Sequence, residues 1–180
     1  MKATGMIRKI DDLGRIVIPK ELRKNLKIKT GEPLEIFIDD EGDLIFKKYL
    51  PMLDISEISE QIATILSEVT GYNCIITDTN SVLVAIGKNV KEYIGKEISM
   101  ELYEIMEERV ILSTKNEKSI NITKEDMKLK HISQIVAPII SDADAIGAIV
   151  LFSNDYNKKI TDNEYQLLKV LTKYIGKQGE

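Results

Sequence analysis

The first 50 residues carry apolar side chains on both faces of the short strands that their pattern predicts. The predicted strands cover residues 4–10, 15–19, 34–39 and 44–49, and one short helix follows the second. In that second strand Ile16 and Ile18 point to one face and Val17 to the other, because successive side chains alternate. A four-stranded sheet with one short helix cannot cover two apolar faces, and so small a unit buries too little surface to be comfortably stable alone. We therefore expect an obligate homodimer through residues 1–50, in which the hairpins of two chains build one shared β-barrel.

A short basic helix is predicted directly after the second strand. Pro19 fits the first helical position, where a missing N–H costs nothing, and Leu22 and Leu26 lie four apart on one helical face. Cations occupy the other side, at Lys20, Arg23, Lys24 and Lys27. So short a segment is not helical in isolation, so packing of its leucine face must hold it.

The charge of the chain is divided unequally between its two parts. Residues 1–29 hold nine basic and three acidic residues, a net charge of +6, whereas the remainder holds 16 basic and 26 acidic residues, a net charge of −10. Such an asymmetry indicates a nucleic-acid-binding end on an otherwise acidic body. Arginine can grip a phosphate bidentately or read the edge of guanine, and a dimer repeats the basic face for two DNA half-sites. The candidate DNA-binding residues are Arg8, Lys9, Arg15, Lys20, Arg23 and Lys24. The alternative is a solvated face with local ion pairs, such as Glu21 with Lys24.

A linker at residues 51–55 separates this unit from a second domain at residues 56–180. The elements predicted there are a helix between Asp54 and Gly71, a hairpin over residues 72–87, a helix over 100–110, a short strand over 118–123, a hairpin over 131–153 that turns at 141–144, and a helix over 161–178. Thr161 and Glu164 form a capping box at the start of the last helix. The fold class is therefore α+β, an antiparallel sheet flanked by a first and a last helix. We expect these two helices to pack together and to offer apolar stripes wide enough for a partner's helices.

Other residues that could carry chemistry favour structural interpretations. Residues 39–43 lack the flanking helices and the final Glu of a calcium loop, so we interpret them as a hairpin turn. Cys74 is expected to be a small buried hydrophobe, and His131 with Ser133 lacks the orienting carboxylate and oxyanion hole of a triad. One Cys and one His cannot form a zinc finger, and no nucleotide-binding or hydrolase motif occurs. We therefore expect no enzyme activity, no metal and no cofactor.

A ligand pocket in the second domain is a further hypothesis. Tyr93, Ile94, Tyr103 and Met106 could line a cavity beside the sheet, and ordinary core is the alternative. No apolar run approaches the roughly 20 residues that span a bilayer. The first residues also lack the apolar core of a signal peptide, and the single cysteine cannot form an internal disulfide. These features favour a cytoplasmic protein with no membrane association.

The pattern G-x-x-R-x-x-D-x-x-G-R-x-x-I-P-x-x-L-R runs from Gly5 to Arg23. With its surroundings at residues 4–49 it resembles the AbrB-type swapped-hairpin DNA-binding domain of bacterial transition-state regulators. The resemblance implies a dimer with interleaved hairpins, and it matches the DNA-contacting arginines of that family to Arg8, Arg15 and Arg23. A further basic position on the helix is Lys24 here, which keeps the charge but loses the bidentate fork of arginine.

The remainder of the chain resembles a GAF domain, a sensory fold. An AbrB-type head joined to a GAF tail is the layout of regulators of sporulation genes, and it implies dimers linked into a homotetramer through the terminal helices of the GAF domains. The sequence thus predicts a sequence-selective transcription regulator, activator or repressor, that binds double-stranded DNA, with small-molecule sensing left open. One alternative is an antitoxin-like module that binds a protein, although the tail here is long and patterned. The other is a small-molecule sensor with an incidental basic head.

Overall fold

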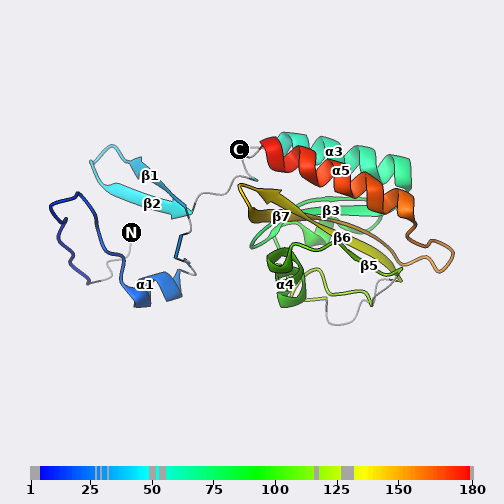
Figure 1. Cartoon of the computed structure of the whole chain (residues 1–180), viewed down its shortest axis with the longest axis horizontal. Helices are drawn as coiled ribbons and strands as arrows, with labels where there is room; N and C mark the ends of the chain where they lie inside the picture. Colours follow the sequence, from blue (N-terminus) through cyan, green and yellow to red (C-terminus); the bar gives the residue numbers. More distant parts are fainter. Residues whose placement is uncertain are drawn as a thin grey trace. The chain divides into compact units, whose positions relative to one another are not determined.

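The computed structural model describes residues 5–26, 28, 30–31, 33–48, 52, 56–115, 118–126 and 132–178 (Figure 1). The chain divides into two compact units, residues 1–49 and 50–180. Met52, which the sequence analysis assigns to the linker, is fully buried in the core of the second unit. The packing of that unit therefore begins before residue 56. Asp54, the predicted helix cap, lies outside the described residues.

The first unit contains a helix and a hairpin. The helix α1 (Lys20–Asn25) precedes the antiparallel strands β1 (Leu34–Ile38) and β2 (Leu44–Lys48), in which Ile36 pairs with Phe46. The hairpin turn predicted at residues 39–43 is confirmed, because Asp39 N donates to Asp43 O at 3.1 Å and the Asp39 carboxylate accepts the N–H of Glu41 and of Asp43.

The two strands predicted nearer the N-terminus are not strands in the single chain. Among the described residues, 5–19 contain no strand, although a tight turn forms between Asp11 and Arg15. A strand is stable only when a neighbouring strand accepts and donates its ladder hydrogen bonds. The described part of this one chain provides no such neighbour to residues 5–19.

Large apolar side chains of the first unit remain exposed in the single chain. Ile7 is 87% exposed, Leu13 is 74% exposed and Ile38 is 73% exposed. The leucine face predicted for α1 is only partly covered, since Leu22 is half-buried and Leu26 is exposed. The other exposed members of this set are Met6, Ile10, Ile16, Val17, Ile36, Phe37, Leu44 and Phe46.

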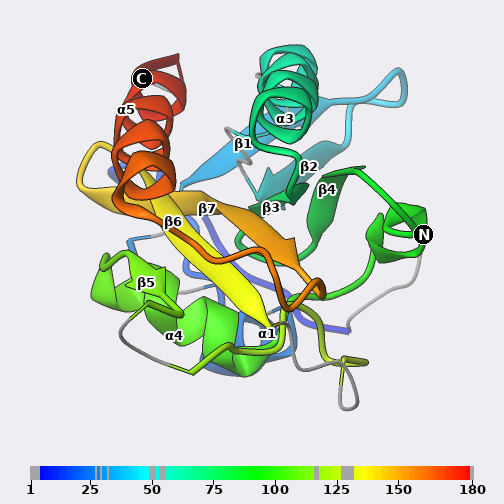
Figure 2. The same cartoon turned by 90° about the vertical axis from the view of Figure 1, so that its right-hand side faces the viewer.

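The second unit is a five-stranded antiparallel sheet with helices on both faces. Its elements are α3 (Ser56–Thr70), β3 (Asn73–Asp78), β4 (Val82–Ile86), the 3-10 helix η1 (Lys91–Tyr93), α4 (Met100–Glu108), β5 (Leu112–Ser113), β6 (Ser133–Ser141), β7 (Asp144–Ser153) and α5 (Asp162–Gln178). The strand order is β4-β3-β7-β6-β5. The helices α3 and α5 lie side by side over one face of the sheet, and α4 covers the other face (Figures 1 and 2).

Alternate residues of each strand fill two separate cores. In β3, Cys74 and Ile76 join the cluster beneath α3 and α5, whereas Ile75 joins the cluster beneath α4. All three side chains are fully buried. A strand with both faces covered reads as an unbroken apolar run, as "CII" does here.

Most predicted elements of the second unit are confirmed, with one exception. The capping box forms, because Thr161 N and Thr161 Oγ1 both donate to Glu164 Oε2, at 2.8 and 2.6 Å. The turn between β6 and β7 has positive φ at Asp142 and Ala143, which suits a two-residue hairpin turn. The strand predicted over residues 118–123 is wrong, since within its described part only an isolated bridge from Thr123 to Ile98 is present.

Candidate nucleic-acid interface

All six candidate cations belong to the first unit. Five of them, Arg8, Lys9, Arg15, Lys20 and Lys24, are exposed, and Arg23 is half-buried. Exposed cations remain available to neutralise DNA phosphates. This neutralisation supplies the part of DNA binding that does not depend on base sequence. The structure therefore leaves the whole predicted set accessible on the single chain, apart from the partly covered Arg23.

The helix α1 holds three of these cations on one short segment. Pro19 is its N-cap residue, with φ −57° and ψ 147°, which is one position earlier than predicted. Glu21 lies in the first turn, whereas Arg23 and Lys24 lie in the last. Acidic residues at the start and basic residues at the end of a helix complement its dipole, so the charges that face outward also support the helix.

Arg23 and Arg8 are held differently. Arg23 Nη1 donates a hydrogen bond to Thr30 Oγ1 at 2.9 Å, which ties its guanidinium to the segment after α1. Arg8 Nη1 donates to the carbonyl of the adjacent Ile7 at 3.0 Å. A hydrogen bond to an adjacent residue restrains the side chain less than one to a residue seven positions away, so the Arg23 side chain is the better fixed of the two.

Arg15 closes the turn that begins at Asp11. Its backbone N–H donates to Asp11 Oδ1 at 2.8 Å, and its Nε donates to Asp11 Oδ2 at 2.8 Å. The backbone hydrogen bond from Arg15, followed by the bond from its side chain, lowers the pKa of Asp11 below its usual value. The turn therefore favours the ionised form of the Asp11 side chain.

One cation on the hairpin was missed by the sequence analysis. Lys47, on β2, lies opposite Glu35, and its Nζ stands 4.6 Å from the ring centroid of Phe37 on β1. A cation over an aromatic face is attracted to its negative centre. The charge count that identified the basic part of the chain covered residues 1–29, so it did not include Lys47. The diagonal cross-strand pairing of "EIF" with "IFK" is the signal that could have found it.

The four candidate pocket residues of the second unit differ in burial. Tyr93 and Met106 are buried in the core beneath α4, Tyr103 packs against the same core, and Ile94 is 53% exposed. The Tyr93 ring meets the Phe152 ring edge-on, with centroids 6.0 Å apart. Burial, together with the nearby Asp126 carboxylate, raises the pKa of Tyr93. Tyr93, Tyr103 and Met106 thus contact the core beneath α4, Ile94 lies at the surface, and a pocket lined by these residues stays a prediction.

The remaining candidates have structural surroundings. Cys74 is fully buried, and burial raises the pKa of its thiol. Ser133 Oγ accepts the Ile160 N–H at 2.9 Å, and His131 lies outside the described residues. Among the described residues no group of three His, Cys, Asp or Glu side chains could hold a metal ion. No helix in that part of the chain is long and apolar enough to cross a membrane.

Each of the two units matches a known protein family. Residues 54–180 match the family model described as stage V sporulation protein T C-terminal, transcription factor, and residues 7–51 match the model of the MazE bacterial antitoxin, an antidote that recognises a toxin. Stage V sporulation protein T of Bacillus subtilis (strain 168) is 37% identical over 183 residues, covering 100% of this chain and 99% of that protein. The transition state regulatory protein AbrB of the same organism is 57% identical over 51 residues, 28% of this chain and 52% of that protein.

The fold of the second unit is also found in solved structures. A GAF domain/HD domain protein from Geobacter sulfurreducens superposes with a TM-score of 0.56 and 14% identity, covering 73% of this chain and 96% of that one. An identity this low shows the fold alone, which is GAF-like.

An AbrB-type head followed by a GAF-like sheet defines a class of bacterial transcription regulators rather than of enzymes. Within that class, the chain belongs to the family of stage V sporulation protein T, a family of sporulation transcription factors.

Proposed function

We propose that the protein regulates sporulation genes in the cytoplasm by binding double-stranded DNA as a homodimer, through Arg8, Lys9, Arg15, Lys20, Arg23 and Lys24 of the first unit. The second unit links such dimers into a homotetramer. The observation that carries this proposal is that one small unit exposes both a set of cations and a large set of apolar side chains. The cations match a partner that is a polyanion, and the apolar side chains match a second copy of the chain.

The apolar exposure supports the dimer. Among the described residues of the first unit, twelve large apolar side chains are at least 37% exposed, with Ile7 and Ile38 among the most exposed. Fully burying one side chain of this size contributes about 1.5–3 kcal/mol. Soluble monomers rarely expose apolar surface on this scale, so the unit requires a cover. The first unit of another chain would also supply the neighbouring strands that residues 5–19 lack in the single chain.

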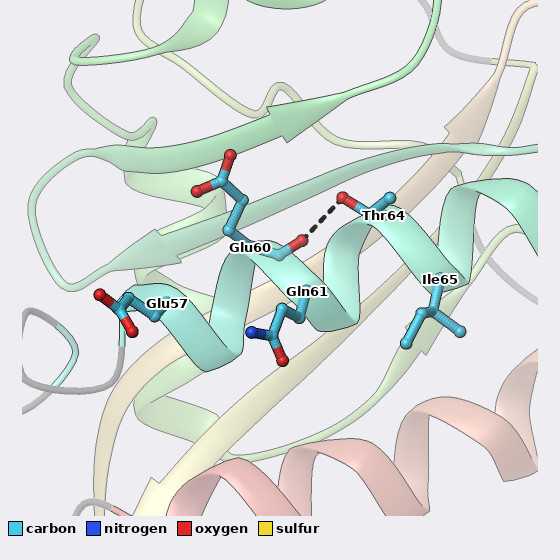
Figure 3. A pocket seen from close by; sticks show the side chains of 5 residues that line it. All are labelled: Glu57, Glu60, Gln61, Thr64 and Ile65. Carbon is cyan, nitrogen blue, oxygen red and sulfur yellow. Dashed lines mark hydrogen bonds between the residues drawn. The ribbon is translucent and has the colours of Figure 1, made fainter.

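The outward face of α3 and α5 supports the tetramer. Ile65 and Val69 on α3, and Val170 and Tyr174 on α5, are each about half or more exposed. The two helices lie side by side on the same face of the sheet, so we infer that these exposed side chains share one surface (Figure 2). Figure 3 shows Ile65 beside Glu57, Glu60, Gln61 and Thr64, which together line a shallow hollow of ≈ 500 Å³ on α3. The mixed polar and apolar lining suits a helix–helix contact between copies.

Selection from a randomised duplex library with the full-length protein tests DNA binding. We expect one sequence to be enriched, and Arg15→Ala to weaken binding to it by about 1–3 kcal/mol while the oligomer stays intact. Lys88→Ala is the matched control, since Lys88 is an exposed cation of the second unit. Binding should also weaken steeply as salt is added. The slope of the logarithm of the binding constant against the logarithm of the salt concentration should be about −0.9 for each neutralised phosphate. An Arg15→Ala isotherm equal to that of the wild type would remove Arg15 from the interface.

Light scattering after size exclusion tests the assembly. The full-length chain should elute with a mass near four times 20.4 kDa. Val69→Asp places a charge on the outward face of α3, so it should halve that mass while leaving the dimer and DNA binding intact. A wild-type monomer would contradict both interfaces.

A small-molecule ligand of the second unit is a separate hypothesis. It draws on the GAF-like fold, and two of its candidate residues, Tyr93 and Met106, are buried in the core beneath α4. Calorimetry of the full-length protein with nucleotides and with branched-chain amino acids tests it. Heat of binding with either class would establish a ligand.

Protein binding is the rival function, because the first unit also matches the antitoxin model over residues 7–51. The folded second unit weighs against it, since antitoxins of this type wrap their targets with a short, unstructured tail. Affinity capture from the host would decide between the two. A stoichiometric small protein that competes with DNA would favour the antitoxin.

A further inference from the structure

Two turns of the first unit share a sequence pattern and a set of hydrogen bonds. Both have the pattern Asp-Asp-x-Gly-x, at residues 11–15 and 39–43. In each turn the N–H of the first Asp donates to the carbonyl of the fifth residue at 3.1 Å, and the Gly N–H donates to the first carbonyl, at 2.9 Å in one turn and 3.0 Å in the other. The first carboxylate accepts the N–H of the third and fifth residues in both. Gly14 and Gly42 have φ of 75° and 85°, which other residues rarely adopt.

The two turns differ at the fifth position, which is Arg15 in one and Asp43 in the other. The side chain of Asp43, as a carboxylate, has no hydrogen to donate, and its turn closes all the same. The arginine is therefore not needed to form the turn. In the first turn, however, Asp11 Oδ2 accepts an additional hydrogen bond from Arg15 Nε, while the Arg15 side chain stays 69% exposed.

This additional bond determines which part of the guanidinium remains for a ligand. Asp11 binds the Nε atom, so that bond does not use the end-on edge formed by the two NH2 groups. That edge is the fork that binds a phosphate, or O6 and N7 of guanine, with two parallel hydrogen bonds. Immobilising an unrestrained arginine on binding costs about 2- to 10-fold in affinity. An arginine already held by Asp11 avoids most of that cost.

We infer that Asp11 is a positioning residue that orients Arg15 toward DNA and thereby raises the preference for specific over nonspecific sequences. The inference rests on the proposed DNA-binding function. The carboxylate also reduces the net charge of the turn, so it weakens attraction to any phosphate backbone. On specific DNA the positioning effect opposes this charge effect, whereas on nonspecific DNA the charge effect acts alone, so the ratio of the two affinities measures positioning.

The substitution Asp11→Asn separates the two effects. Asparagine keeps one carbonyl oxygen for the N–H groups of Leu13 and Arg15, so the turn is retained. It replaces Oδ2 with an amide NH2, which cannot accept a hydrogen bond from Arg15 Nε. Asp12→Asn removes the same charge from the same turn, and within the described residues Asp12 makes no bond to Arg15. Asp39→Asn makes the same change in the turn that has no arginine.

The measurement is the affinity of each full-length variant for the duplex that the wild type enriches, and for a shuffled duplex of the same composition. Asp12→Asn should raise both affinities equally and leave their ratio unchanged. Asp39→Asn should also leave the ratio unchanged. Asp11→Asn should raise the affinity for the shuffled duplex and lower the specificity ratio by about 2- to 10-fold.

Three different results would count against this inference, and each leads to a different conclusion. A ratio for Asp11→Asn equal to that of Asp12→Asn would overturn the positioning role. Loss of both affinities with a lower urea midpoint, in Asp11→Asn but not in Asp39→Asn, would assign Asp11 a purely structural role. A wild type that enriches no duplex would refute the proposed DNA binding itself.

Discussion

Gly176 lies where α5 closely approaches the backbone of β6. A Cβ atom added there would stand 2.0 Å from the carbonyl oxygen of Ile140 and 3.0 Å from its carbonyl carbon. Ordinary contact begins at 3.4 Å, so the helix would have to retreat by about 1.4 Å at this point. The atom in the way belongs to the backbone of β6, which pairs with β7 at this position and cannot swing aside as a side chain could.

Two effects of Gly176→Ala oppose each other. In a helix, alanine is more favourable than glycine by about 1 kcal/mol. Overpacking costs about 1–3 kcal/mol, occasionally more, because the retreat of α5 also separates the buried Leu168 and Ile175 from the core. The clash is with backbone, so we place its cost at the upper end. The expected net result is a loss of about 2 kcal/mol in the free energy of unfolding.

Urea unfolding of the full-length protein, followed by tyrosine fluorescence, measures this loss. The chain has no tryptophan, and six of its seven tyrosines lie in residues 50–180, so the signal reports mainly on the second unit. Lys173→Ala, at an exposed position of the same helix, is the control and should change the midpoint little. A midpoint for Gly176→Ala at or above that of the wild type would show that propensity outweighs the contact, and it would refute the packing argument.

Three further outcomes are expected. Thr161→Ala removes the capping box and should cost about 0.5–2 kcal/mol in urea unfolding; an unchanged midpoint would mean that α5 does not depend on its cap. Cys74 should react with a thiol reagent only after denaturation, because burial raises its pKa, and rapid labelling of the native protein would contradict its position in the core. Burial raises the pKa of Glu164, but the hydrogen bonds from Thr161, the backbone N–H of Glu164 and the nearby Lys158 together lower it more, so it lies below its ordinary value of 4.5. The stability that Glu164 contributes should be complete above pH 4.5 and be lost as the pH falls through the lower folded pKa, and Glu164→Gln should abolish that part of an acid titration.

Local chemistry made much of the second unit predictable. The capping box of Thr161 with Glu164 is a short-range pattern, and it forms as expected. Gly71, the predicted end of the first helix, follows α3 directly with φ of 65°. Strand order was not predictable in the same way, because β3 lies between β4 and the distant β7. Such a pairing depends on packing between segments more than 60 residues apart, which no local pattern specifies.

Charge and motif predict which residues form the candidate interface, but they do not predict the hydrogen bonds among those residues. Counting charges treated Asp11 as one negative charge to subtract from the positive ones. The structure instead makes it the hydrogen-bond partner of Arg15, so an acidic residue becomes part of the basic site. Comparing residues 11–15 with residues 39–43 would have revealed the shared turn, and with it the one position at which they differ.

The same comparison explains why two predicted strands are missing from the single chain. The turn at residues 39–43 joins two paired strands, β1 and β2, whereas the turn at residues 11–15 joins segments with no ladder among the described residues. A turn fixed by Asp and Gly forms from local contacts alone, but a ladder needs a second strand at the right distance. A closed turn with exposed apolar segments on both sides is therefore the state expected of a hairpin whose partner strands belong to another molecule. In the proposed dimer, residues 5–19 would gain the neighbouring strands that they lack here, whereas the Asp11–Arg15 pair is already present in the single chain.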